Sequence, residues 1–245
     1  MSDRADLVLG DTGGVSVLPI SAITFLNSHH YSAYKTKAEH DISRGVLAKA
    51  SWDLLLIKCG FEEHLNSITF TDEVDPKPSL NPGCVVIKIP ESVMGEPVSV
   101  KLFEKLGFSV SIQGFNGRAE VLRSLYTKPG TYEIKSYLDA GACGLTEKER
   151  KQNIPKEYKL PSPVVELSKN ILMHSINPQR PLNQNILCHC HCSSNRLTAL
   201  VSAVTETLKE EAPYRTSPKR LFVYSGEFGI SDKMIGSSFA RKIAR

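Results

Sequence analysis

The strongest constraint on the fold is an apolar segment that leads into five alternating cysteine and histidine residues. It starts at Ile186, continues through Cys188–Cys192 into a polar Ser-Ser-Asn-Arg turn, and ends in a helix-like pattern that reaches Glu211. Alternate residues of an extended strand point to opposite faces, so the three cysteines would share one face and the two histidines the other. The segment therefore predicts a strand–loop–helix unit.

Short strands are predicted through most of the first 140 residues. The expected strands cover residues 67–71, 84–89, 98–102, 108–112 and 131–138, after a hairpin within 6–26. The expected helices cover 35–48, 119–126, 164–175 and 197–211, and a weak basic helix covers 231–245 after a strand over 220–225. Residues 51–59 are too short and too apolar to distinguish a buried strand from a buried helix. Strands followed by helices indicate an α+β fold, with a β-rich, mostly antiparallel N-terminal part and helices concentrated in the C-terminal part.

The character of the chain changes between residues 139 and 163. A Gly-Ala-Cys-Gly breaker is followed by a charged turn and by Pro155, Pro161 and Pro163, which favour extended backbone. We therefore predict a β-rich domain over 1–140, a proline- and charge-rich connection over 141–163, and a helix-containing basic part over 164–245. A chain of 245 residues can also form one continuous domain.

The cysteine cluster has two interpretations that need no catalysis. Free cysteine behaves as a small apolar residue, so the three thiols can simply pack in the core. Alternatively, a zinc ion would need four tetrahedral ligands, which structural sites usually space by two to four residues. The candidate zinc ligands within the cluster are Cys188, Cys190, Cys192 and His191, and those elsewhere are Cys59, Cys143 and His174.

A third interpretation comes from residues 189–196. They resemble the His-Cys-x5-Arg phosphate-binding loop of cysteine-dependent phosphatases. The resemblance implies that Cys190 is the nucleophile and that Arg196 binds the phosphate oxygens, with a helix starting near the arginine to stabilise the thiolate. The segment departs from the family pattern because it has no glycine, and no aspartate lies at the usual distance upstream.

The predicted strand over residues 67–71 is followed by Asp72. The sequence Ile-Thr-Phe-Thr-Asp is similar to the strand–aspartate signature of the thirty-kilodalton-type movement proteins of plant viruses. The match covers five residues, and the glycine-tryptophan segment often seen before it is missing. It implies a viral type of protein and does not establish membership of that family.

Positive charge is concentrated at the carboxyl end. The formal net charge of the chain is +4, and the segment from Tyr214 to Arg245 holds seven Lys or Arg residues against two acids. Basic residues interleaved with aromatic ones can bind phosphates and stack on bases. The candidate binding residues are Arg215, Lys219, Arg220, Lys233, Arg241, Lys242 and Arg245.

These features predict a non-enzymatic binding or structural protein of the nucleic-acid-binding kind, because no complete catalytic constellation accompanies the basic end. Its expected partner is nucleic acid, RNA in particular, or an acidic protein surface, and the basic end could also contact an anionic membrane surface. The alternatives are the phosphatase-like hydrolase using Cys190 and Arg196 and a zinc-stabilised interaction module.

The N-terminal residues lack the layout of a secretory signal, and no apolar run is long enough to span a bilayer. The six cysteines are therefore expected to be reduced thiols in an intracellular protein, cytoplasmic or nuclear, that is not secreted.

Overall fold

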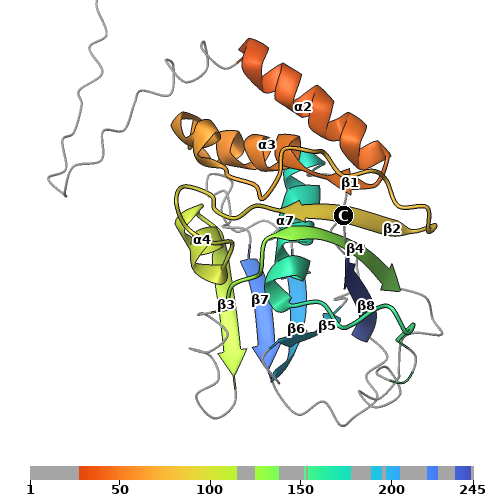
Figure 1. Ribbon diagram of the computed structural model, residues 1–245. Helices are drawn as coiled ribbons and strands as arrows, with labels where there is room; N and C mark the ends of the chain where they lie inside the picture. Colours follow the sequence, from red (N-terminus) through yellow and green to blue (C-terminus); the bar gives the residue numbers. More distant parts are fainter. Residues whose placement is uncertain are drawn as a thin grey trace, which may run out of the picture.

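The structure is a computed structural model that describes residues 28–114, 125–137, 152, 154–177, 189–194, 197–204, 220–225 and 235–243. Its centre is one curved sheet in which all the described strands take part (Figure 1). The strands are β1 (Val46–Leu47), β2 (Cys84–Ile89), β3 (Ser109–Gly114), β4 (Gly130–Tyr137), β5 (His189–Ser194), β6 (Leu197–Val204), β7 (Arg220–Ser225) and β8 (Ile235–Lys242).

The sheet is mixed, with the strand order β1-β2-β4-β8-β5-β6-β7-β3. Three pairs are parallel, β1 with β2, β3 with β7 and β5 with β8, and the other neighbours are antiparallel. Strand β4 lies between β2 and β8, so strands from both sides of the proline-rich segment are direct neighbours. The division into domains at 141–163 remains a prediction.

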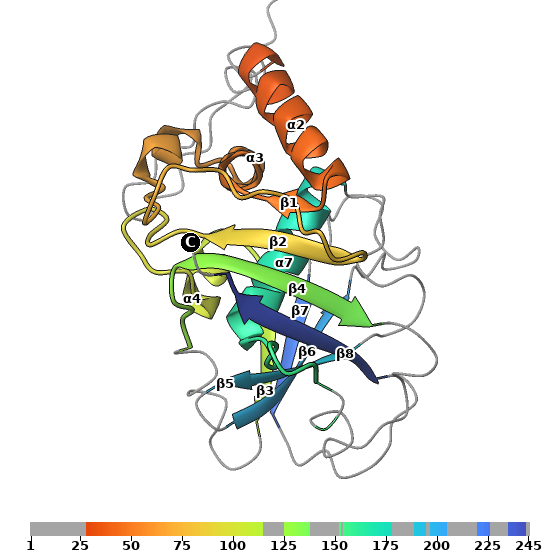
Figure 2. The same ribbon diagram turned by 45° about the vertical axis from the view of Figure 1, so that its right-hand side comes forward.

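The helices are α2 (Ser28–Ser43), α3 (Lys49–Cys59), α4 (Val100–Lys105) and α7 (Pro163–Ile176), and a 3-10 turn, η1, covers Glu62–Ser67. Figures 1 and 2 show α2 and α3 at the end of the sheet formed by β1 and β2. Helix α7 lies against the inner face of the curved sheet, between the strands β2 and β4 and the strands β6 and β7. The sheet thus curves around one central helix.

The predicted fold class is wrong in two respects. Helices α2, α3 and α4 lie in the N-terminal part, and α7 is the one helix that the structure describes after residue 163. The described remainder of that part consists of strands β5–β8, and the sheet is mixed rather than mostly antiparallel. The physical reason is strand pairing, because apolar C-terminal segments that could form helices are hydrogen-bonded as strands on both sides.

Two expected helices are strands. Residues 197–204, expected to begin a helix, form β6, which pairs with β5 and β7. Within the expected basic helix over 231–245, residues 235–242 form β8 between β4 and β5. A run such as Leu-Thr-Ala-Leu-Val-Ser-Ala-Val has apolar residues at spacings that suit either element, so tertiary pairing decides.

Some of the other predicted strands and helices are confirmed, and others are wrong. The strands predicted over 84–89, 108–112, 131–138 and 220–225 correspond to β2, β3, β4 and β7. Residues 98–102 are not a strand, because Ser99 caps α4 by accepting a hydrogen bond from the amide of Leu102. Residues 67–71 contribute one isolated bridge, at Thr69, and the expected helix over 35–48 is α2, which ends at Ser43. The hairpin within 6–26 and residues 119–124 lie outside the described residues.

Helix α3 explains why residues 51–59 were ambiguous. Seven successive side chains, from Ala50 to Leu56, are buried, because α2, α7 and β1 surround the helix. A helix that is buried on all sides shows no amphipathic pattern. Trp52, which is fully buried, donates a hydrogen bond from Nε1 to the carbonyl of Lys88 (2.9 Å) and ties α3 to β2.

Helix α7 forms where the sequence predicts it. Its N-cap Ser162 accepts a hydrogen bond from the amide of Val165 (3.2 Å), and Pro163 takes the first helical position, where its missing N–H costs nothing. Val164, Leu167 and Ile171 are at most 1% exposed and belong to the core. The prediction of a helix over 164–175 is therefore confirmed.

Residues 71–83 form a loop whose polar contacts fasten it to the other face of β2 and β4. Lys88 of β2, whose side chain is 3% exposed, donates to the carboxylate of Asp72 (2.8 Å) and to the carbonyls of Asp72 (2.8 Å) and Val74 (2.6 Å). The three bonds use all three ammonium protons. Burial is the main cause that lowers the pKa of Lys88. One end of the loop is thus held by a buried cation, and the other end contacts Glu133.

Candidate functional site

Strands β4 and β8 carry charged residues on both faces where they pair. The register places Glu133 opposite Arg241, and the adjacent pair, Tyr132 and Lys242, is also opposite. Because successive side chains of a strand alternate between faces, the two pairs lie on opposite sides of the sheet. One side carries an ion-pair cluster around the buried Glu133, and the other borders a cavity.

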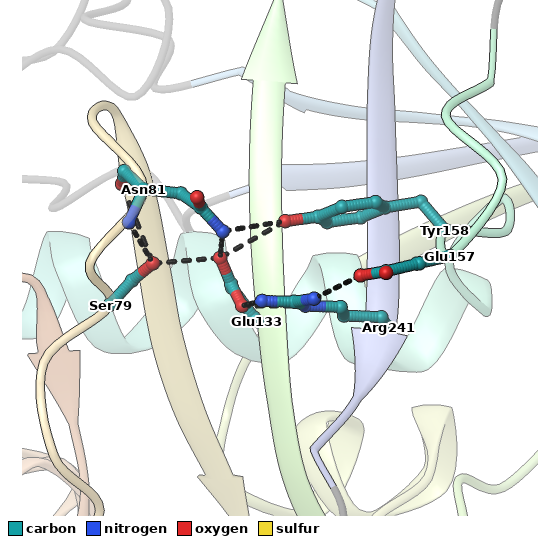
Figure 3. Close-up of polar contacts among 6 residues, drawn as sticks. All are labelled: Ser79, Asn81, Glu133, Glu157, Tyr158 and Arg241. Atoms are coloured by element: carbon teal, nitrogen blue, oxygen red, sulfur yellow. Dashed lines mark hydrogen bonds and ion pairs between the residues drawn. The ribbon is translucent and has the colours of Figure 1, made fainter.

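The ion-pair cluster is centred on the buried carboxylate of Glu133, which is 2% exposed (Figure 3). Its Oε2 accepts a hydrogen bond from Nε of Arg241 (2.7 Å) and forms an ion pair with Nη2 of the same guanidinium (2.7 Å). Its Oε1 accepts from Ser79 Oγ (2.7 Å), Asn81 Nδ2 (2.7 Å) and the Tyr158 hydroxyl (3.0 Å). A cation and three neutral donors, from three segments of the chain, therefore converge on one carboxylate.

The shifted pKa values keep Glu133 ionised and Tyr158 neutral across the ordinary pH range. Burial alone would raise the pKa of Glu133, but the bonds from Asn81, Ser79, Arg241 and Tyr158 outweigh it and lower this pKa to about 2. Burial and the bond to Glu133 raise the pKa of Tyr158 to about 12. General acid–base catalysis works best with a pKa near the operating pH, so neither group is suited to it near neutrality.

Cys84 of β2 lies beside this cluster. Burial and the neighbouring Glu133 carboxylate raise the pKa of its thiol. The thiolate is the nucleophilic form of cysteine, so this environment makes Cys84 unreactive. The whole cluster has the character of a structural ion-pair network.

Arg241, one of the predicted partner-binding residues, is engaged inside the protein. In addition to its two contacts with Glu133, its Nη1 donates to Glu157 (2.5 Å), and its guanidinium lies 5.1 Å from the ring centre of Tyr158. Two carboxylates and an aromatic ring therefore surround a single cation (Figure 3). This arrangement joins β8 to β4 and to the segment before α7.

On the other face is a cavity of about 330 Å³, here called the lysine hollow. It is lined by residues of three segments, 126–132, 159–165 and 240–242, and includes Lys128, Lys159 and Lys242. All three lysines are exposed, and none of the lining residues is acidic. Among the described residues, no carboxylate forms an ion pair with any of the three, so the described lining carries an excess of positive charge.

The position of Lys242 depends on a glycine. Its ammonium group donates to the carbonyl of Pro129 (2.9 Å), which leaves two N–H donors for other partners. The side chain passes over Gly130, where an added Cβ would lie 2.6 Å from its Cε. Gly130 also has φ = +134°, a conformation that disfavours other residues. Only glycine permits this pose of Lys242 at the mouth of the hollow.

Aromatic and apolar groups complete the lining. The side chain of Tyr126 is 61% exposed, an unusual exposure for a large ring. The ring of Tyr132 lies 6.0 Å from the Lys242 ammonium, and its hydroxyl donates to the carbonyl of Lys128 (2.8 Å). Leu160 and Pro161 add apolar surface. The hollow thus combines cations with a ring and an apolar wall, which suits an anionic ligand that also has a flat apolar part.

The other residues that the sequence suggested as binding, catalytic or metal-ligating residues lie in different elements or outside the described residues. Arg220 is the first residue of β7, whereas Arg215, Lys219, Lys233 and Arg245 lie outside the described residues. Cys190, His191 and Cys192 are in β5, where an extended strand was expected, and Cys188, Cys143 and Arg196 lie outside the described residues. His174 is on α7 and Cys59 ends α3, on separate helices. The zinc interpretation remains a prediction.

The phosphatase-like interpretation required a helix that begins near Arg196. The chain instead continues as β6 from Leu197, and Ser194 pairs directly with Leu197 across the β5–β6 ladder. A strand has no helix dipole and no row of unpaired amides to stabilise a thiolate at Cys190. The structural context that supported this interpretation is therefore absent from the described residues.

Sequence reasoning missed Lys128, Lys159 and Tyr126. They come from segments far apart in the sequence, and β4 and the bridge between Lys159 and Ala240 bring them together. It also missed Glu133, which is a single acid in an alternating strand. No local pattern marks any of these residues.

The chain significantly matches no protein-family model, no curated protein and no solved structure. Among the residues that the structure describes, no helix is both long enough and apolar enough to cross a membrane.

Proposed function

We propose that this chain is a non-enzymatic binding protein that contacts single-stranded nucleic acid, RNA in particular, through its basic carboxyl segment and the lysines beside it. The observation that carries the proposal is the lysine hollow, where Lys242 of the carboxyl segment joins Lys128 and Lys159 without an acidic neighbour in the described lining. The excess of seven basic over two acidic residues in 214–245 extends the same charge along the chain.

Two observations support binding rather than catalysis. The described cluster with the most strongly shifted pKa values keeps Glu133 ionised and Tyr158 neutral across the ordinary pH range. Lysines without ion-pair partners, in contrast, can neutralise phosphates and release the counterions that condense on a nucleic acid.

The proposal assigns different roles to neighbouring basic residues. Lys242 faces the lysine hollow and contacts the ligand, whereas Arg241 holds β8 to β4 through Glu133. Neutralising Arg241 therefore tests the fold, and neutralising Lys242 tests binding. The proposal also includes, because of their positive charge alone, the other candidate binding residues Arg215, Lys219, Arg220, Lys233 and Arg245.

The test is fluorescence anisotropy of a labelled random single-stranded RNA, measured between about 50 and 200 mM salt. We expect binding that weakens steeply with salt, and Lys242→Gln should reduce the slope of log K against log salt by about 0.7. The matched control is Lys105→Gln, because Lys105 is an exposed lysine of α4 that pairs with Glu96 (2.6 Å) outside the hollow. It should leave the slope unchanged.

Absence of salt-sensitive binding at low ionic strength would contradict the proposal. Polyglutamate and vesicles containing phosphatidylserine serve as competitors for the labelled RNA. If either displaces the RNA at equal charge concentration, the surface recognises negative charge in general, and an acidic protein or a membrane surface replaces nucleic acid as the partner.

A further inference from the structure

We propose that the lysine hollow is a binding site for one nucleotide, with its phosphate among Lys128, Lys159 and Lys242 and its base against Tyr126. This inference rests on the proposed function and specifies how the same surface recognises its ligand. A free mononucleotide and one nucleotide of a single strand share this chemistry.

The size of the hollow suits one nucleotide. Its volume of about 330 Å³ lies at the lower end of the range for small-ligand pockets, roughly 300–1,000 Å³. A base that is paired and stacked in a duplex could not enter it without leaving the helix, which costs free energy. The site therefore favours free nucleotides and single strands over duplexes.

The phosphate would contact lysines that line the hollow together, one of which is held in place. Lysine binds phosphate as a compact point charge, and three lysines can surround one dianion. Lys242 is preordered by its bond to the Pro129 carbonyl and by the missing side chain at Gly130. No acidic residue is among the described residues of the lining, so none of these competes for the ammonium groups.

The base would find a stacking partner in Tyr126. An aromatic ring that is 61% exposed beside a cationic cavity can stack on a base without first leaving a packed core. Stacking of this kind is tolerant of base identity, because every base presents a π-face. Leu160 and Pro161 supply apolar contacts that a phosphate alone would not use.

The test compares four ligands by isothermal titration calorimetry with the full chain: adenosine 5′-monophosphate, adenosine, ribose 5-phosphate and inorganic phosphate. We expect the mononucleotide to bind at least about ten-fold more tightly than each of the others, since only it contacts both parts of the site. A duplex RNA should compete less well than the corresponding single strand.

Two pairs of variants separate the two contacts. Tyr126→Ala should remove the preference for the mononucleotide over ribose 5-phosphate, and Tyr126→Phe should keep it. Lys159→Gln should weaken the binding of the mononucleotide and of ribose 5-phosphate by a similar factor. Lys105→Gln should leave the binding of both unchanged. Circular dichroism of each variant checks that the fold is retained.

The salt-dependent RNA binding measured on the same samples separates this inference from the proposed function. If RNA binds but the mononucleotide binds no better than phosphate, or Tyr126→Ala changes nothing, the nucleotide site is refuted and the polyanion surface stands. If the mononucleotide binds and RNA does not, the site stands for a free nucleotide and the proposed function fails. If neither ligand binds, both are refuted.

Discussion

At the scale of single residues, Glu133 shows how one polar residue of a strand can hold several segments of the chain together. Its carboxylate is almost fully buried, yet its bonds to Arg241, Ser79, Asn81 and Tyr158 fill its acceptor sites. An ionised carboxylate is tolerated in such a place only when it is paired and hydrogen-bonded. Removing its charge should therefore be costly, because the donors around it would lose their acceptor.

We predict that Glu133→Gln lowers the free energy of unfolding by about 3 kcal/mol, because it leaves Arg241 without its buried partner. The measurement is urea denaturation followed by circular dichroism. Glu157→Gln is the matched control, since Glu157 binds the same arginine but its side chain is 72% exposed. It should cost less than about 1 kcal/mol. Equal losses in the two variants would show that burial of Glu133 is irrelevant to its role.

The same carboxylate predicts a dependence of stability on acid. The pKa of Glu133 is about 2 in the folded protein, against an ordinary value of 4.5. A depressed pKa stabilises the folded state fully above pH 4.5, and this contribution of about 3 kcal/mol is lost as pH falls from 4.5 towards 2. Urea titrations at several pH values should show this loss in the parent and a smaller loss in Glu133→Gln. The same pH profile in both proteins would contradict the assignment.

At the scale of elements, the loop over residues 71–83 is held by two buried charges of opposite sign. Lys88 of β2 binds its first part, and Glu133 of β4 binds Ser79 and Asn81 near its end. A loop with three prolines and few apolar side chains could not cover the face of a sheet by hydrophobic contact. Its placement depends instead on hydrogen bonds to these two side chains.

We predict that Lys88→Met releases the first part of this loop. The ammonium group makes three bonds to Asp72 and Val74, and a methionine can replace its volume but none of its hydrogen bonds. Hydrogen–deuterium exchange should increase at residues 72–76 and remain unchanged in β4. Lys77→Met, at an exposed lysine of the same loop, serves as control. No gain in exchange would show that the loop is placed by other contacts.

Helices and strands also differ in whether nearby residues determine their secondary structure. Helix α7 has its signals within a few residues, because Ser162 caps it, Pro163 starts it and apolar residues follow at helical spacing. Strand β6 has no such signal and is a strand because β5 and β7 pair with it on both sides. The first could be predicted from the sequence, and the second could not.

At the scale of the whole molecule, the sheet joins strands from both ends of the chain around α7. The strand β8 near the carboxyl end lies beside β4, and the part-buried bond between Arg241 and Glu133 links them. Trp52, the single tryptophan of the chain, lies fully buried near the opposite end of the same sheet.

We predict that the described sheet unfolds in one cooperative step. Tryptophan fluorescence reports on the contacts of α3 with β2, and far-ultraviolet circular dichroism reports on the backbone of the whole chain. In a two-state transition the two signals give the same midpoint in urea. Separate midpoints would favour two independent domains divided at residues 141–163.

The candidate site shows most clearly what depends on tertiary structure. Lys242 was recognised from the charge of the carboxyl segment, but its partners Lys128 and Lys159 carry no signal in their own segments. Arg241 has the same local character as Lys242, and only the register with Glu133 turns one towards an internal carboxylate while the other borders the hollow. A strand alternates its faces, so a shift by one residue would exchange their roles.

By itself, the amino-acid sequence determined the capped helix α7, the strands β2, β4 and β7 and the concentration of positive charge near the end of the chain. These follow from interactions between residues close together in the chain, or from composition. Only the tertiary structure decided that β6 and β8 are strands, that Arg241 is engaged by the buried carboxylate of Glu133 and that three distant lysines share a cavity. Strand β6 depends on pairing with β5 and β7. The positions of Arg241 and Lys242 depend on pairing between β4 and β8, a hundred or more residues apart, and no local pattern encodes the register of such a pair.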